Sequence, residues 1–238
     1  MVVIAALIIG AFLAAAISGS AGFGGALLLL PLLTRVAGAE AAVPLLTVAQ
    51  LLGNAARIGF NFRAIQWRPV GLFLIGALPA AAAGALWFAS LPPAATVRLI
   101  GAALLTFVIL RAAGLLAFKP SPGLLFAGGA VTGLLSGLVG TAGPLGAAIF
   151  LSLNLPPLAY LASEAVTALA MHMIKLAVYG TRLDLDPEFW PLALAMGAAM
   201  VSGTWAGKAV TAKLSPERFR VLVSVLLAAV AVQMLVTG

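Results

Sequence analysis

The sequence of 238 residues contains no cysteine, one histidine and six acidic residues, and only 8% of it is charged. Without cysteine, disulfide bonds and thiolate metal sites are excluded. Soluble domains contain about one-quarter charged residues, and here 63% of the chain is hydrophobic instead. Apolar runs reach the roughly 20 residues that span a membrane and recur along the whole chain. The sequence therefore predicts an all-α, polytopic integral membrane protein.

The formal charge of +7 does not indicate a nucleic-acid partner. The basic residues are scattered among expected loops and helix ends, and they form no patch interleaved with aromatic residues. Orientation in a membrane explains such a distribution, because basic residues accumulate on the cytoplasmic side. Membrane lipid, and not nucleic acid, is the expected surrounding.

One glycine-rich stretch occurs twice. SGSAGFGG at residues 18–25 recurs as SGLVGTAG at residues 136–143, an offset of 118 that keeps the pattern S-G-x-x-G-x-x-G. Polar positions repeat at the same offset: Asn54 matches His172, and Arg57 matches Lys175. Self-similarity of this kind indicates an internal duplication. We expect one transmembrane domain made of two repeats, residues 1–119 and residues 120–238.

Each repeat is expected to contain a glycine-broken apolar element followed by three transmembrane helices. The broken elements are expected at residues 2–34 and at about 123–151. The helices are expected at about 41–60, 69–90 and 94–117 in the first repeat, and at about 159–180, 189–211 and 217–236 in the second.

The basic residues predict how the broken elements sit in the membrane. If each element enters and leaves on the same side, the regions 57–68, 111–119 and 208–220 share one side, with nine basic residues against four opposite. If each element crosses once, the split is seven to six. The positive-inside rule favours the first arrangement. Three crossings per repeat make the repeats inverted, so we expect two inverted repeats, each a re-entrant hairpin plus three transmembrane helices.

The two glycine motifs are the strongest candidate binding elements. Broken helices at matching positions of two repeats place half-helix N-termini, with free N–H groups and positive dipole ends, at mid-membrane, where an anion is favoured. The candidate substrate-binding residues are Ser18, Gly19, Ser20, Gly22, Gly24 and Gly25 in the first motif and Ser136, Gly137, Gly140, Thr141 and Gly143 in the second. The alternative is that small residues only allow close helix packing.

The helix after each broken element carries a second candidate surface. Residues spaced three or four apart share one helix face, and polar faces in a membrane look toward the bundle interior or a cavity. The residues on these faces that we expect to bind substrate are Gln50, Asn54 and Arg57 in the first repeat and His172 and Lys175 in the second. Glu164 and His172 are the candidates for proton coupling.

Several of these residues also have a purely structural interpretation. Arg57 lies near a helix end, where its side chain can snorkel to lipid headgroups. Lys175 can pair with Asp184 or Asp186, and Glu164 can be a charge at a helix start. A lone histidine such as His172 is often a hydrogen-bonded packing residue. Gln50 and Asn54 can bridge helices.

The doubled motif, at the head of each repeat and followed by an apolar run, resembles the sulfite exporter TauE/SafE family of bacterial membrane proteins. The resemblance covers nearly the whole chain. It implies a transporter of the bacterial cytoplasmic (inner) membrane for small anions such as sulfite or organosulfonates, usually acting in export. The family's usual G-G-G run is replaced by GFGG at 22–25 and by GTAGP at 140–144, which leaves the exact ligand open.

These observations predict a multi-pass secondary active transporter that works by alternating access, with a small anion as its substrate and no cofactor. The chain has no P-loop motif, so ATP is not expected to drive transport directly. Lipid-facing and subunit-facing apolar helices look alike in sequence, which leaves homo-oligomerisation open.

Two other classes of function remain as alternatives. The first is a membrane scaffold or assembly factor without flux. The second is an intramembrane serine hydrolase that uses Ser136 and His172. The hydrolase is disfavoured because Ser136 lies in GLLSG and not in a nucleophile elbow. The expectation is therefore a protein that is not an enzyme.

Overall fold

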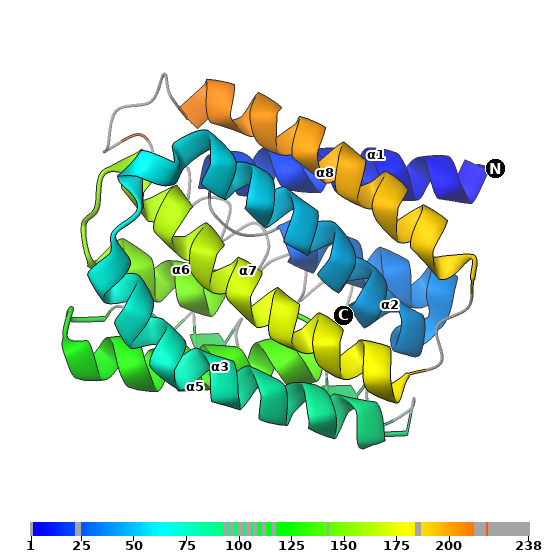
Figure 1. Ribbon diagram of the computed structural model, residues 1–238, viewed down its shortest axis with the longest axis horizontal. Coiled ribbons are helices and arrows are strands. Elements are labelled where there is room, and N and C mark those ends of the chain that lie inside the picture. Colours follow the sequence, from blue (N-terminus) through cyan, green and yellow to red (C-terminus); the bar gives the residue numbers. More distant parts are fainter. Residues whose placement is uncertain are drawn as a thin grey trace.

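The computed structural model describes residues 2–21, 25–92, 118–141, 143–183 and 187–211, several positions between 95 and 115, and Arg218. All regular elements of this described part are helical, as the composition predicts (Figure 1). They are α1 (Val2–Ala21), α2 (Gly25–Asn61), the 3-10 helix η1 (Phe62–Ala64), α3 (Trp67–Ser90), α5 (Pro122–Val139), α6 (Gly143–Ser152), α7 (Pro157–Arg182) and α8 (Phe189–Thr211).

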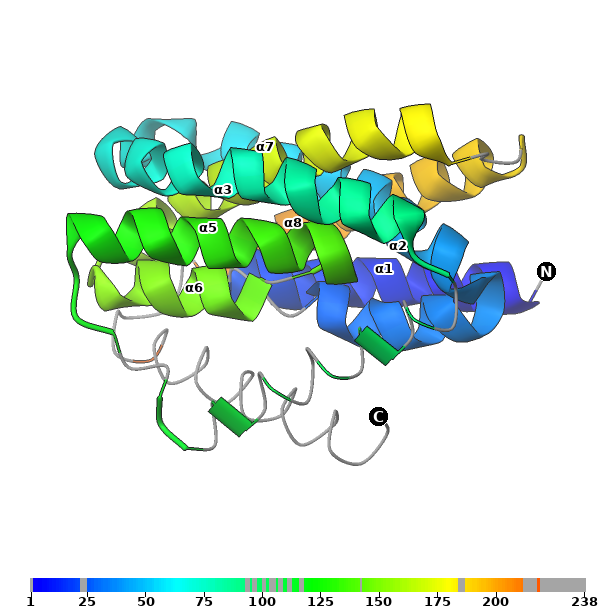
Figure 2. The same ribbon diagram turned by 90° about the horizontal axis from the view of Figure 1, so that it is seen from below.

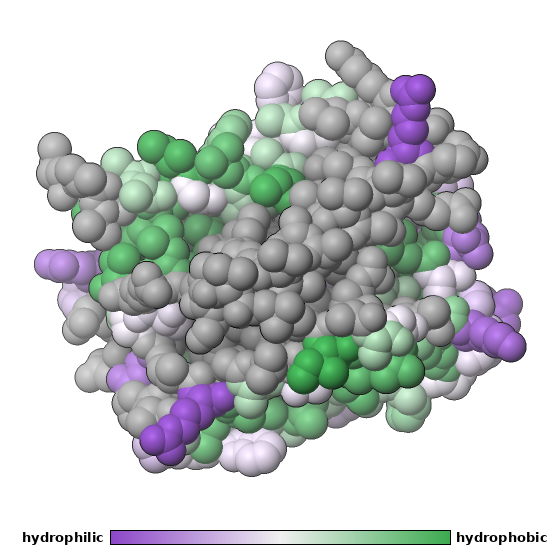
Figure 3. Space-filling model, turned by 180° about the vertical axis from the view of Figure 1, so that it is seen from behind, coloured by the Kyte–Doolittle hydropathy of each residue, from purple (hydrophilic) through white to green (hydrophobic). Residues whose placement is uncertain are grey.

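Five helices of the described part are long and apolar enough to cross a membrane. They are Glu40–Ala64, Trp67–Ser90, Pro122–Val139, Pro157–Arg182 and Phe189–Ala209. In Figure 3 hydrophilic side chains lie at the two ends of the bundle, and the visible described surface between them is mostly apolar. The described part is thus organised as a multi-pass membrane protein, in which apolar side chains face lipid.

Four of the expected transmembrane helices, 41–60, 69–90, 159–180 and 189–211, are confirmed within a few residues. Most of the expected helices 94–117 and 217–236 lie outside the described residues. The expected division between residues 2–34 and the next helix occurs at Gly38, which has φ 74° and ψ 161° inside α2. Glycine adopts this conformation without the steric cost of a Cβ atom, so α2 consists of two helical pieces.

The chain turns back after α1 and again after α5. A Cβ atom at Gly10 of α1 would lie 3.2 Å from Leu29 of α2, and one at Gly128 of α5 would lie 2.5 Å from Ile149 of α6. Figures 1 and 2 show that the two segments of each pair run antiparallel. Figures 1 and 2 show that α1 and α5 begin at opposite ends of the bundle.

The closest helix contacts join the first half of the chain to the second. Helix α3 packs along α5, and α8 packs along α1. Gly84 of α3 meets Gly137 of α5, and Gly207 of α8 meets Gly19 of α1. These contacts join matching positions: Gly137 matches Gly19 at the offset of 118, and Gly207 matches Gly84 at an offset of 123, which follows a small insertion in the second half. Small residues let membrane helices approach until their backbones touch.

One end of the bundle is rich in basic residues. It comprises η1 and the beginnings of α3 and α5, together with the end of α8 (Figure 1). Basic residues within or next to these segments are Arg63, Arg68, Lys119 and Lys208. Lys208 of α8 donates a hydrogen bond of 2.7 Å to the carbonyl oxygen of Phe60, near the end of α2. The sequence analysis assigned all of these segments to a single side.

We expect Gly84→Ala to lower the thermal unfolding midpoint of the protein in detergent. The new Cβ atom would lie 2.4 Å from the Leu134 carbonyl oxygen, so α3 and α5 must separate, at a cost of about 1–3 kcal/mol. Gly71→Ala on the same helix is the matched control, since nothing lies within 4 Å of its Cβ position. Equal midpoints for the two variants would contradict this account of the α3–α5 contact.

Candidate functional site

The serine and glycine that open each motif lie in the last turn of a helix. Ser18, Gly19 and Ser20 belong to the end of α1, and Ser136 and Gly137 belong to the end of α5. The last carbonyl groups of a helix have no partner within the helix. Both helix ends therefore present backbone oxygens that must find donors elsewhere. Gly22 and Gly24 lie outside the described residues.

A buried cationic side chain meets each of these helix ends. Nη1 of Arg57 donates to the Ser18 carbonyl oxygen at 3.3 Å, and Nζ of Lys175 donates to the Ser136 carbonyl oxygen at 3.4 Å. In both pairs the partners are 39 residues apart. Since Arg57 matches Lys175 and Ser18 matches Ser136, the same interaction occurs in both repeats. A cation at a helix C-terminus is favoured by the helix dipole.

Side chains of α7 donate further hydrogen bonds to carbonyl groups at the end of α5. Lys175 Nζ also donates to the Gly140 carbonyl oxygen at 3.0 Å, and the Tyr179 hydroxyl donates to the Gly137 carbonyl oxygen at 3.0 Å. Gly140 has φ 80°, the left-handed conformation with which glycine commonly ends a helix. A side chain at Gly140 would also approach Val43 to 3.0 Å. The break after α5 is therefore held by side chains of α7 and by a glycine cap.

In the first repeat the predicted polar residues lie together around a small cavity. The cavity is lined by Ala15, Ser18, Gln50, Gly53, Asn54, Arg57, Met200 and Thr204. Its volume is about 10 Å³, which is at most the space of one water molecule. The bundle is thus closed around these side chains. Thr204, whose hydroxyl donates to the Gly53 carbonyl oxygen at 3.5 Å, was missed by the sequence analysis, although it is a polar residue within an apolar helix.

Two matched polar residues each keep a buried nitrogen atom without a hydrogen-bond partner among the described residues. These atoms are Nδ2 of Asn54 and Nδ1 of His172, at positions related by the repeat offset. Asn54 is 1% exposed and His172 is 7% exposed. The other side of the Asn54 amide is engaged, because Oδ1 accepts a hydrogen bond from Arg57. A buried polar atom without a partner is costly, and a ligand can provide the missing partner.

Arg57 also forms an ion pair between the two repeats. Its Nη1 lies 3.1 Å from Oε2 of Glu164 on α7, and the two side chains are 5% and 6% exposed. This burial within the bundle does not fit snorkelling of Arg57 to lipid headgroups. Lys175 is completely buried. The alternative partners proposed for it, Asp184 and Asp186, lie outside the described residues.

Each of the two breaks is followed by the N-terminus of another helical segment. The segments begin at Gly25 and at Gly143, and Figures 1 and 2 show both starting in the interior of the bundle and not at its ends. The first N–H groups of a helix have no partner within it and carry a partial positive charge. Thr141, just before α6, is buried as well.

Gly19 and Gly137 have a clear structural role. Both lie in the contacts between the two halves of the chain, against α8 and α3 respectively, so close packing accounts for glycine at these positions. Their part in a substrate site stays a prediction. Among the described residues, no group of three histidine, cysteine or acidic residues is placed to hold a metal ion.

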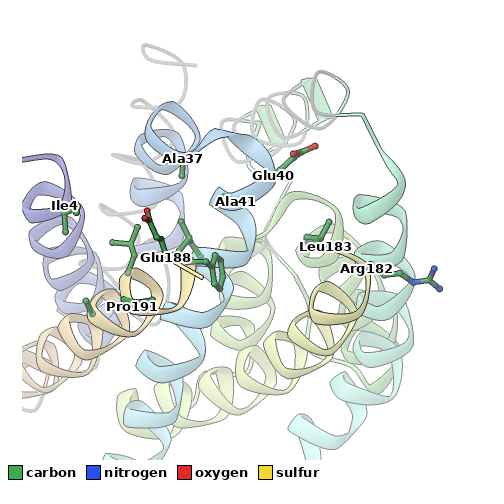
Figure 4. A pocket seen from close by; sticks show the side chains of 12 residues that line it. Ile4, Ala37, Glu40, Ala41, Arg182, Leu183, Glu188 and Pro191 are labelled. Carbon is green, nitrogen blue, oxygen red and sulfur yellow. The ribbon is translucent and has the colours of Figure 1, made fainter. Parts of the chain in front are cut away.

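A second cavity, of about 820 Å³, lies between the beginning of α8 and the segment of α2 around Gly38. Figure 4 shows Glu40 and Glu188 at this cavity, with the Arg182 side chain directed away from it. The two carboxylates make the lining unsuitable for an anion, because like charges repel. The residues predicted to bind an anion lie instead at the helix breaks.

Helices long enough to span a membrane, two interior helix breaks and buried polar side chains beside them define a membrane protein of the transporter class. Residues 7–234 match the sulfite exporter TauE/SafE family, and the chain belongs to that family. Membership implies membrane transport of anions such as sulfite at the level of the family, which consists of transporters and not enzymes. No curated protein and no solved structure shows a significant match to the chain.

We expect Tyr179→Phe to lower the thermal unfolding midpoint slightly, because it removes the hydrogen bond from α7 to the Gly137 carbonyl oxygen. Hydrogen bonds between membrane helices contribute about 0.6 kcal/mol on average. Thr181→Val is the control, since the exposed Thr181 hydroxyl bonds only to carbonyl groups of its own helix. A Tyr179→Phe variant as stable as the control would show that this bond contributes nothing to the helix break.

Proposed function

We propose that the chain is a secondary active transporter that exports small anions, sulfite or organosulfonates, across the bacterial cytoplasmic membrane by alternating access. The observation that carries this proposal is the matched arrangement at the two helix breaks. At each break a buried cationic side chain, Arg57 or Lys175, lies at the end of one helix, and the N-terminus of another helical segment follows within a few residues.

The electrostatics of this arrangement favour an anion. A guanidinium group and helix N-termini attract negative charge, and the attraction is stronger in an apolar interior than in water. The unpartnered nitrogens of Asn54 and His172 can donate hydrogen bonds to the oxygen atoms of a sulfite or sulfonate group. Sulfur oxyanions present several acceptor oxygens, which matches a site composed of donors.

We further propose that the repeats are inverted and that α1 with the first part of α2, and α5 with α6, are re-entrant hairpins. The antiparallel course of each pair and their starts at opposite ends of the bundle (Figure 2) support this proposal. The end that carries Arg63, Arg68, Lys119 and Lys208 would face the cytoplasm by the positive-inside rule. Substrate would then reach the helix breaks alternately from the two sides.

The proposal assigns substrate contact to Ser18, Gln50, Asn54 and Arg57 in the first repeat and to Thr141, His172 and Lys175 in the second. Because the bundle leaves only about 10 Å³ beside Arg57, a sulfonate requires the helices around this space to separate. Relative movement of the two repeats is the motion that alternating access demands. Proton coupling is assigned to Glu164 or His172.

The test is flux of sulfite and of a sulfonate in proteoliposomes under imposed proton and sodium gradients. We expect Arg57→Gln to reduce the flux at least about tenfold and Arg57→Lys to retain part of it, because the positive charge is kept. Arg63→Gln is the control, since Arg63 is exposed in η1. Absence of flux for all of these anions with the wild-type protein would refute the proposal.

A further inference from the structure

Among the described residues, the Arg57–Glu164 ion pair has no counterpart in the other half of the molecule. The residue that matches Glu164 at the repeat offset is Leu46. No ion pair with an acidic side chain joins Lys175 in the described residues, whereas Arg57 holds the Glu164 carboxylate at 3.1 Å. The two cationic side chains serve the same structural role at the helix ends, so the helix break itself does not require a carboxylate.

The Glu164 carboxylate occupies the position that an anionic substrate would need. Arginine binds carboxylates and other oxyanions with the same donor groups. With Glu164 ionised, the nearly buried guanidinium group already has its countercharge. A second anion at this place would add an uncompensated negative charge inside an apolar bundle, which is strongly unfavourable.

We propose that Glu164 is a tethered competitor of the transported anion for Arg57, and that protonation of Glu164 releases Arg57 to the anion. This inference rests on the proposed transport function and names the residue that couples it to protons. The proton is taken up by a carboxylate oxygen of Glu164, which becomes a neutral carboxylic acid. No other bond forms or breaks, and loss of the proton restores the ion pair and expels the anion.

Other ionisable groups lie near Glu164 and must be separated from it in a test. Arg57 faces it from α2. On α7 itself Tyr160 lies one turn earlier, and His172 and Lys175 lie further along the helix. Of the charged residues in η1 and at the start of α3, both of which pack near α7, Arg63 and Arg68 are exposed. His172 is therefore the main rival for a pH effect near neutrality.

The proposal predicts the sign of the pH dependence. Proton and anion bind together, so the affinity for an anion increases as the pH falls. Each anion bound at Arg57 is accompanied by one proton, and no net charge is added to the site. Anion-driven flux should therefore move protons in the same direction as the anion.

The experiment measures binding of methanesulfonate to the purified full chain by titration calorimetry between about pH 5.5 and pH 8. Methanesulfonate keeps its single negative charge over this range. A change in affinity with pH therefore reports protonation of a group on the protein. We expect wild-type affinity to increase toward low pH. For Glu164→Gln we expect about tenfold tighter binding at neutral pH and loss of the pH dependence.

Glu164→Leu provides a second variant, because it places the residue of the other repeat at this position. It should behave as Glu164→Gln does. Glu188→Gln is the control: it alters an exposed carboxylate and should keep the wild-type affinity and pH dependence. His172→Asn introduces the matched residue of the first repeat and tests the rival; it changes the affinity if His172 contacts the anion, but it should keep the pH dependence. A pH-sensitive dye in proteoliposomes should report proton movement with anion flux for the wild type but not for Glu164→Gln.

The inference is overturned if Glu164→Gln binds methanesulfonate with the affinity and pH profile of the wild type, or if His172→Asn abolishes the pH dependence. Failure of the transport function itself gives a different result. In that case neither the wild type nor any variant binds or moves sulfite, sulfate or sulfonates at any pH.

Discussion

Carbonyl groups at the end of a helix have no water to bind inside a membrane, and each one left without a donor is costly. Two helices of this protein, α1 and α5, end within the bundle, and the rest of the arrangement depends on how their carbonyl groups are satisfied. Arg57 and Lys175 donate to them from the helices that follow. The positions of α2 and α7 are therefore fixed by hydrogen bonds to the helix breaks as well as by apolar packing.

The same side chains link structure to function. A cationic group that stabilises a helix C-terminus in an apolar interior also creates positive potential beside the next helix N-terminus. The protein balances this potential differently in its two halves. Glu164 neutralises Arg57, whereas the described hydrogen bonds of Lys175 and its neighbour Tyr179 go to backbone oxygens. One ionic interaction thus distinguishes two helix ends whose sequences match.

Hydrophobic run lengths predicted four of the described transmembrane helices well, because spanning a membrane imposes a length that can be read directly from composition. The repeat offset also paired Arg57 with Lys175 before any contact was known. The partners of these side chains could not be predicted, since Ser18 and Ser136 contribute backbone oxygens and any residue has one. The Arg57–Glu164 pair could not be predicted either. It joins positions 107 residues apart and has no counterpart in the other repeat among the described residues.

The crossed packing of α3 on α5 and of α8 on α1 has a consequence for how the protein acquires its structure. Each half contributes a row of small residues whose complementary surface is synthesised in the other half. Gly207 of α8, which touches Gly19 of α1 across this boundary, reaches it only after most of the second half has been synthesised. The halves are therefore folding partners and not independent units. A substitution at their contact weakens the packing of both halves.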